Sequence, residues 1–135
     1  MMFEVSVRAT FSAAHRLKGY RGKCENIHGH NWEVEVFIGT ETLDKQGISI
    51  DFKLLKSKLR DVLAALDHCD LNKINFFKKG NPSAENIAKY IYINLKKTIK
   101  SKSAFLRRIS VWETKDTCAT YFECEKKRSY CCRED

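Results

Sequence analysis

The chain has little proline, little glycine and no long hydrophobic stretch. One proline and six glycines among 135 residues exclude a collagen-like repeat and a proline-rich disordered chain. The longest strictly apolar run, Val62 to Leu66, is far too short to cross a bilayer. The first ten residues mix charged and apolar side chains and lack the hydrophobic core of a signal peptide. We therefore expect a cytoplasmic protein that does not bind membranes.

Length and composition predict one folded domain. A chain of 135 residues can bury one hydrophobic core but not two, and a hydrophobic content of 43% supplies the apolar surface for it. We place this domain at residues 1–124 and a basic, cysteine-containing tail at residues 125–135. Lys and Arg number 25 against 17 acidic residues, a net charge of +8, which favours an anionic partner, either nucleic acid or a small phosphorylated ligand.

Hydrophobic periodicity predicts four strands and two helices. Residues 3–11 and 32–38 alternate apolar and polar side chains, as half-buried strands do. Helices are expected after the capping residues Asp51 and Ser83. The first helix has an apolar stripe of Phe52, Leu55, Leu59, Val62, Leu63 and Leu66, and the second one of Ile87, Ile91 and Leu95.

Two further strands are expected around residues 109–111 and over residues 119–124. The order is then strand, strand, helix, helix, strand, strand. Because no strand-helix-strand alternation is present to build a parallel sheet, this order predicts an α+β fold with a four-stranded antiparallel sheet and both helices on one face. An open sheet has two exposed edges, so association of subunits is expected.

Three of the four histidines can meet at one end of the first two strands. His28 and His30 are two residues apart at the entrance to a strand, so their side chains point to the same side. His15 follows the other strand, which is expected to pair with the strand that begins after His30. Three neutral imidazoles with an open fourth position are typical of a catalytic zinc site. The alternative is that these histidines are ordinary polar surface.

Cys24, four residues before His28, leaves two interpretations open. Its sulfur is either a fourth ligand, which makes the zinc structural, or a thiolate beside the metal that acts as a base. Asp67 and His68 are adjacent where the first helix is predicted to end. They form either a catalytic pair, which requires an irregular backbone, or a favourable helix C-terminus. Glu113, near the end of a strand, indicates by itself only a carboxylate facing solvent.

Five segments must be read together: SAAHRL, CENIHGHNW, LDHCDLN, NPSAENIA and VWETKDTCATY. In this order they resemble the family of 6-pyruvoyltetrahydropterin and 6-carboxytetrahydropterin synthases, and the resemblance covers residues 3–123. The spacing of Cys24 and His28, with three residues between them, resembles that of the bacterial 6-carboxytetrahydropterin synthases. The resemblance implies the tunnelling fold (T-fold), in which two trimers stack into a homohexamer with sites at subunit interfaces.

The resemblance also implies a reaction and a role for each candidate residue. The reaction converts 7,8-dihydroneopterin triphosphate and water to 6-carboxytetrahydropterin, acetaldehyde and triphosphate, a step in queuosine biosynthesis. The implied roles are Zn²⁺ binding by His15, His28 and His30, proton transfer by Cys24, Asp67 and His68, and pterin binding by Glu113. The triphosphate would be held by cations among Arg16, Lys18, Arg21 and Lys23.

Two other functions stay open at this point. A 6-pyruvoyltetrahydropterin synthase would use the same substrate and a nearly identical site. A zinc-stabilised basic module that binds nucleic acid would use Cys24 as its fourth ligand. We expect the 6-carboxytetrahydropterin synthase, with a small pterin triphosphate as the partner and no nucleic acid.

Overall fold

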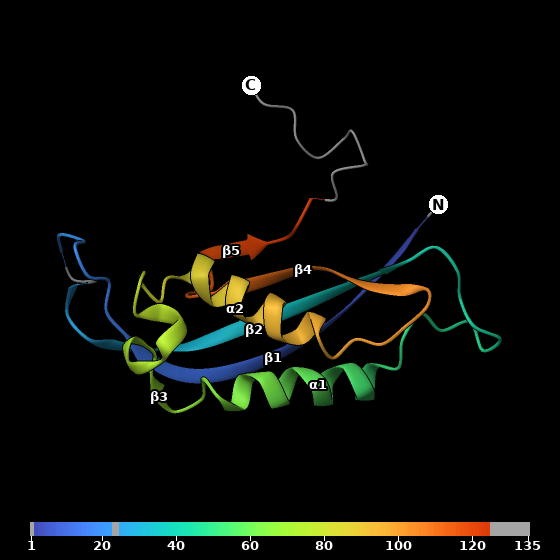
Figure 1. Ribbon diagram of the computed structural model, residues 1–135, viewed down its shortest axis with the longest axis horizontal. Helices are drawn as coiled ribbons and strands as arrows, with labels where there is room; N and C mark the ends of the chain where they lie inside the picture. Colours follow the sequence, from blue (N-terminus) through green and yellow to red (C-terminus); the bar gives the residue numbers. More distant parts are fainter. Residues whose placement is uncertain (1, 23–24, 125–135) are drawn as a thin grey trace, which may run out of the picture.

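A computed structural model describes residues 2–22 and 25–124, so Lys23, Cys24 and the proposed tail lie outside the described residues. The described residues form strands, α-helices and short 3-10 helices (Figure 1). In chain order they are β1 (Phe3–His15), β2 (His28–Thr40), α1 (Phe52–Ala64), β3 (Cys69–Asp70), η2 (Leu71–Lys73), η3 (Asn75–Phe77), α2 (Ala84–Lys96), β4 (Ala104–Trp112) and β5 (Cys118–Tyr121).

The strands form one sheet in the order β3-β1-β2-β4-β5. The α+β class and the two helices agree with the sequence prediction, but the sheet has five strands and is not purely antiparallel. The additional strand β3 pairs in parallel with Ala13 and Ala14 of β1. Two residues are too few to show a periodic pattern, and their pairing depends on where the chain returns after α1. The amide of His68 donates to the carbonyl of Ser12 at 2.6 Å and fixes that return point.

Strands β1 and β2 are longer than their hydrophobic alternation predicts. They pair antiparallel along their whole length, from Phe3 opposite Thr40 to His15 opposite His28. His15 therefore belongs to the strand and does not follow it. The last residues of β1 and the first of β2 are small or polar, so the apolar pattern fades while the hydrogen-bonded ladder continues. Strand β5 ends at Tyr121, before the predicted end at Cys124.

One face of the sheet carries the hydrophobic core, and both α-helices pack against it. The apolar positions of β2, Trp32, Val34, Val36 and Ile38, are fully buried. Most of the predicted helix stripes are also buried, including Leu55 and Leu59 of α1 and Ile87, Ile91 and Leu95 of α2. Phe52 is an exception at 53% exposure, because it lies in the first turn of α1, ahead of the leucines that face the sheet.

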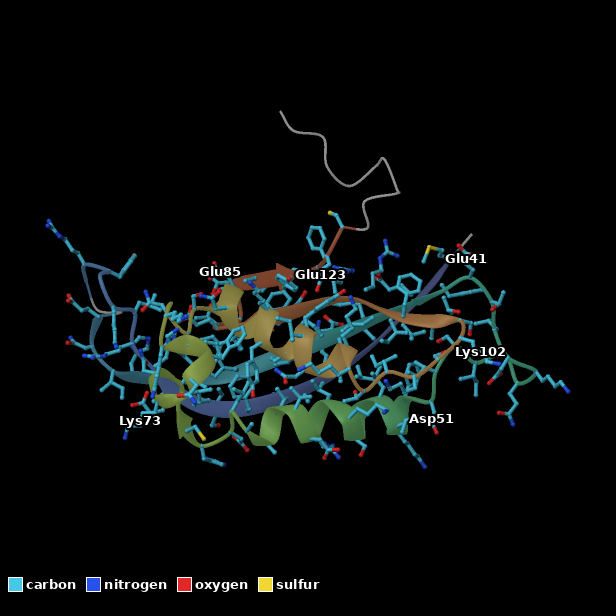
Figure 2. All side chains as sticks on the ribbon, in the orientation of Figure 1. Glu41, Asp51, Lys73, Glu85, Lys102 and Glu123 are labelled. Carbon is cyan, nitrogen blue, oxygen red and sulfur yellow. The ribbon has the colours of Figure 1, made fainter. Side chains whose placement is uncertain are left out.

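Both predicted helix caps are confirmed. The carboxylate of Asp51 accepts a hydrogen bond from the amide of Lys53 at 2.9 Å, and the hydroxyl of Ser83 accepts one from the amide of Asn86 at 3.2 Å. Asp51 marks the start of α1 and Glu85 the first turn of α2 in Figure 2. The cap at Ser83 fixes the loop before α2, which contacts the histidines described below.

The opposite face of the sheet is polar. Arg8 of β1 forms ion pairs with Glu33 at 2.8 Å and Glu35 at 3.1 Å, both on β2. None of the helices in the described part of the chain is long and apolar enough to span a membrane.

Candidate metal centre

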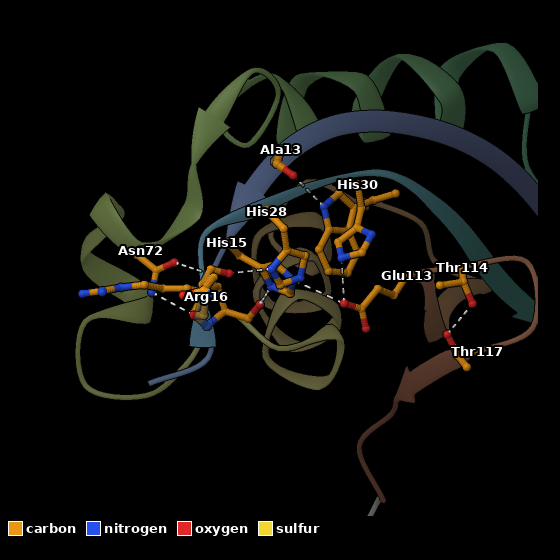
Figure 3. Close-up of polar contacts among 12 residues, drawn as sticks. Ala13, His15, Arg16, His28, His30, Asn72, Glu113, Thr114 and Thr117 are labelled. Carbon is orange, nitrogen blue, oxygen red and sulfur yellow. Dashed lines mark hydrogen bonds and ion pairs between the residues drawn. The ribbon is translucent and has the colours of Figure 1, made fainter. Parts of the chain in front are cut away.

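Three imidazoles meet on the core face at the end of the β1–β2 ladder. His15 and His28 are direct cross-strand partners, and His30 lies opposite Ala13 on the same face. The Nε2 atoms of His15 and His28 are 3.0 Å apart, and the ring centroids of the three histidines lie 4.6 to 5.2 Å from one another. The structure thus brings together the three residues that the sequence predicts as ligands (Figure 3).

Backbone carbonyls orient two of the three rings. Nδ1 of His15 lies 2.7 Å from the carbonyl of Pro82, and Nδ1 of His28 lies 2.7 Å from the carbonyl of Asn26. Because a carbonyl oxygen can only accept, Nδ1 must carry the proton in both rings. In the neutral imidazole, Nε2 then has a free lone pair, which is the arrangement that a metal-binding histidine requires.

Glu113, the residue directly after β4, joins the histidines. Val111 of β4 lies opposite Val34 on the core face, so alternation directs the side chain of Glu113 to that face as well. Its Oε1 atom lies 3.2 Å from Nε2 of His15 and 3.0 Å from Nε2 of His30. The prediction from the isolated residue, a solvent-facing carboxylate, is wrong: the Glu113 side chain is only 30% exposed.

The four side chains fit a divalent metal ion. Their ligand atoms all lie within 4.8 Å of one another. Among the described residues, nothing forms an aligned hydrogen bond with the buried Nε2 of His30, although Oε1 of Glu113 lies 3.0 Å away. A buried nitrogen without a hydrogen bond costs free energy, whereas imidazole nitrogens and carboxylate oxygens are both ordinary zinc ligands. The four side chains therefore fit zinc chemically, and a bound zinc ion would also provide a partner for the buried nitrogen of His30.

The electrostatics of His30 favour the form that binds metal. Burial lowers the pKa of His30 below its usual value, and the neighbouring His15 and His28 lower it further, while the negative charge of Glu113 partly opposes the shift. His30 is therefore neutral near pH 7, with its Nε2 lone pair available.

Asp67 and His68 lie at the turn that leads into β3. Oδ1 of Asp67 accepts a hydrogen bond from the amide of Ser12 at 2.9 Å, and Oδ2 lies 3.6 Å from Nε2 of His68, too far for a hydrogen bond. His68 has φ = 56°, so the irregular backbone that such a pair requires is present. Its side chain is 83% exposed.

Two pockets are each lined by one of the three histidines. An open pocket of about 510 Å³ is lined by His30, His68 and Asp70 among others. A second, of about 200 Å³, is lined by His15, Glu113 and Glu85 together with the start of α2. The structure thus places the exposed histidine of the Asp67–His68 pair on the wall of a pocket that reaches His30.

Sequence reasoning did not find the two carbonyls that orient His15 and His28, since any residue supplies a carbonyl. Alternation from Val111 could have placed Glu113, which directly follows β4, on the core face, but its contact with the histidines depends on strand register and could not have been predicted. Cys24 lies outside the described residues, so the choice between ligand and base is not tested. Three of the four predicted cations, Arg16, Lys18 and Arg21, are among the described residues. The side-chain amides of Asn72 and Asn81 hold the backbones of Arg16 and Lys18, respectively.

The fold and site together define a class: an α+β protein with a histidine-rich, carboxylate-containing centre at one end of a mainly antiparallel sheet. Residues 4–124 match the family model of 6-pyruvoyl tetrahydropterin synthase. The chain therefore belongs to this family, whose members are enzymes of the lyase type and share the T-fold.

Named relatives differ in activity. The chain is 37% identical to the dihydroneopterin monophosphate aldolase of Pyrococcus furiosus, over 84% of this chain and 91% of that protein. It is 32% identical to the 6-carboxy-5,6,7,8-tetrahydropterin synthase of Haemophilus influenzae, over 90% and 100%. The structure of Caenorhabditis elegans 6-pyruvoyl tetrahydropterin synthase matches with a TM-score of 0.83 at 31% identity, over 92% of this chain and 97% of that one.

Proposed function

We propose that the protein is a zinc-dependent 6-carboxy-5,6,7,8-tetrahydropterin synthase. It would convert 7,8-dihydroneopterin triphosphate and water to 6-carboxytetrahydropterin, acetaldehyde and triphosphate, in the route to queuosine. The observation that carries the proposal is the convergence of three histidine Nε2 atoms and the Glu113 carboxylate beside two open pockets. Two observations support the carboxytetrahydropterin activity within the family. They are the spacing of Cys24 and His28 and the presence of 6-carboxytetrahydropterin synthases among the relatives.

His15, His28 and His30 would hold the zinc ion. When bound, zinc supplies Lewis acidity that makes nearby substrate hydroxyls more acidic. The carbonyls of Pro82 and Asn26 keep two of the rings in the required tautomer. The fully buried Trp32 packs against His15 and His30, with ring centroids 4.9 and 5.1 Å away, and limits the access of water from the core side.

The remaining residues would bind the substrate and move protons. Glu113 would accept hydrogen bonds from the amino group and ring N–H of the pterin, a paired contact that suits a carboxylate. Cys24, as a thiolate, would remove the carbon-bound proton of the substrate. His68 would exchange protons with the reacting groups, and Asp67 would orient it. The bond from the Ser12 amide to Asp67 supports that role, because it holds the carboxylate near the histidine.

Two neighbouring activities are the main alternatives. The match to the C. elegans structure favours 6-pyruvoyltetrahydropterin synthesis, and the Pyrococcus furiosus relative favours an aldolase that acts on the monophosphate. The zinc-stabilised basic module that binds nucleic acid, with Cys24 as its fourth ligand, is not favoured, because the matched family is one of synthases.

Product analysis separates the three activities. The purified, zinc-loaded protein is incubated with 7,8-dihydroneopterin triphosphate or with the monophosphate, and the products are identified by mass. We expect acetaldehyde and 6-carboxytetrahydropterin from the triphosphate, and loss of turnover when a chelator removes zinc. A diketone side chain would assign the pyruvoyl reaction, and cleavage of the monophosphate alone would assign the aldolase. Cys24→Ala should retain zinc and lose turnover; a metal-free variant would make Cys24 a ligand.

A further inference from the structure

Among the described residues, none gives His30 the backbone contact that orients the other two histidines. The carbonyl oxygens of Pro82 and Asn26 lie 2.7 Å from Nδ1 of His15 and of His28, respectively, whereas no carbonyl in the described part of the chain accepts a hydrogen bond from His30. A metal-binding histidine is usually held in one orientation by an outer contact of this kind, and its loss weakens metal binding. The orientation of the His30 ring therefore depends on the side chains packed against it.

The indole of Trp32 packs against both His30 and His15. Its ring centroid lies 5.1 Å from that of His30 with the planes 75° apart, and 4.9 Å from that of His15 with the planes 88° apart. Trp32 follows His30 by two positions in β2, so both side chains lie on the core face. Perpendicular ring contacts are directional, because the edge of one ring is positive and the face of the other is negative. Each contact therefore restricts the plane of one imidazole.

The indole is itself fixed in the core. Trp32 is fully buried, and its Nε1 atom donates a hydrogen bond to the carbonyl of Ala13 at 3.2 Å (Figure 3). Ala13 lies opposite His30 in the β1–β2 ladder, so this bond joins the two strands beside the metal-binding rings. Phe11, the cross-strand partner of Trp32, stacks against it with the ring planes 9° apart. The indole therefore keeps one orientation and can hold its neighbours in theirs.

We propose that Trp32 is a positioning residue of the metal centre, which holds the rings of His30 and His15 in the planes at which their Nε2 atoms meet. The inference rests on the proposed zinc site and assigns no contact between Trp32 and the substrate. An aliphatic residue at this position would still supply apolar volume to the core, but it has no ring face for the histidines. The fold thus requires a hydrophobic residue 32, whereas the metal centre requires an aromatic one.

Zinc affinity tests this role. Zinc dissociation constants are measured by competition with a chromophoric chelator for the wild type, Trp32→Leu and Trp32→Phe. Removal of an outer contact of a ligand weakens metal binding about 10- to 100-fold, so Trp32→Leu should weaken it at least about tenfold. Trp32→Phe keeps an aromatic ring but loses the bond to Ala13, and its affinity should lie between those of the wild type and Trp32→Leu. This conservative variant carries the test if Trp32→Leu does not fold.

Phe77→Leu is the matched control for loss of an aromatic ring from the core. Phe77 is 2% exposed and packs against Phe76 and Tyr90, and its described ring contacts include no histidine. The variant should be less stable than the wild type, because it loses buried apolar volume. Its zinc affinity should nevertheless remain near the wild-type value.

Cobalt spectra provide a readout that lower stability alone does not change. In the Co²⁺-loaded protein, the visible absorption bands report the arrangement of ligands around the ion. Both Trp32 variants should shift these bands or change their intensity, whereas Phe77→Leu should reproduce the wild-type spectrum. All spectra are recorded at saturating Co²⁺, so that weaker binding does not imitate a change in ligand geometry.

The outcomes distinguish failure of the inference from failure of the proposed function. Wild-type zinc affinity and wild-type cobalt spectra in both Trp32 variants would overturn the inference and leave the three-histidine site intact. Equal weakening by Phe77→Leu and Trp32→Leu would also overturn it, because general core stability would then explain the loss. A wild-type protein that binds no zinc would overturn the proposed zinc enzyme and this inference with it.

Discussion

At the scale of the residue, small contacts decide which atoms of the site can react. The carbonyls of Pro82 and Asn26 each accept the Nδ1 proton of a histidine, and so they direct the Nε2 atoms of His15 and His28 to the centre. His30 is set differently, because its burial among two other imidazoles favours the neutral ring. When the metal is absent, burial of these imidazoles lowers the stability of the folded protein, by an amount that depends on pH.

The lowered pKa of His30 predicts that the metal-free protein loses stability in acid. In the unfolded chain, His30 takes up a proton as the pH falls through about 6.5, but the folded protein resists protonation until the pH is lower. The unfolded state therefore binds more protons in this window, and stability falls with pH until the folded-state pKa is passed. Urea unfolding with chelator present, between about pH 7.5 and about pH 5, should show this fall.

The contribution of His30 is isolated by comparing slopes. The fall in unfolding free energy should be shallower in His30→Asn than in the wild type. His68→Asn changes an exposed histidine and should keep the wild-type slope. An equal slope in His30→Asn and the wild type would contradict the argument.

At the scale of the element, the end of β1 is extended by side chains instead of by another strand. Asn72 of η2 pairs with Arg16, accepting from its amide at 2.8 Å and donating to its carbonyl at 3.1 Å. Asn81 pairs with Lys18 in the same way, at 2.8 and 2.9 Å. The loop containing Asn81 also supplies the Pro82 carbonyl to His15. These two amides fix the backbone beyond His15, and Asn81 connects it to the loop before α2.

Asn81→Asp should weaken this connection. The carboxylate keeps the acceptor for the Lys18 amide but replaces the donor with an oxygen that faces the Lys18 carbonyl. We expect a loss of about 1 kcal/mol in unfolding free energy, measured by urea denaturation, together with faster hydrogen exchange at Lys18. Asn75→Asp makes the same chemical change at an exposed position and should have little effect. If both variants behave alike, the bonds to Lys18 contribute nothing measurable.

At the scale of the whole molecule, the sheet leaves backbone groups available at its edges. Over residues 3–11, β1 pairs only with β2, and β5 forms the other edge with four residues. Exposed edges of this kind favour association with further copies of the chain. Among the predicted site residues, His15 is buried and His28 and His30 are partly buried, whereas the side chain of His68 is exposed. This separation suits the proposed homohexamer, in which a neighbouring subunit completes each site.

Subunit mixing tests whether sites are shared. His28→Ala and His68→Ala should each be inactive alone. After joint unfolding and reassembly in equal amounts, about one quarter of the sites would combine an intact histidine set with an intact His68 from a neighbour, giving about one quarter of wild-type activity. His28→Ala mixed with His30→Ala should recover nothing, because both changes affect the same three-histidine set. No recovery in the first mixture would place each complete site within one subunit.

Much of the fold could be predicted from the sequence because it depends on local pattern. Alternation along residues 3–11 and 32–38 identified the two central strands, and the leucines after Asp51 identified α1 with its cap. The two-residue strand β3 could not be predicted, because its pairing is set by where the chain after α1 meets β1. The longer ends of β1 and β2 were missed for a similar reason, since the ladder continues where hydrophobicity does not.

The sequence by itself determined which chemical groups are present and that three histidines could share one end of a strand pair. Residue type and a spacing of two suffice for this, because a strand alternates its side chains. Only the tertiary structure decided that Glu113 joins them, that two backbone carbonyls orient the rings, and that His68 remains exposed. These contacts connect residues distant in the chain, and their geometry depends on strand register and on how the loops pack.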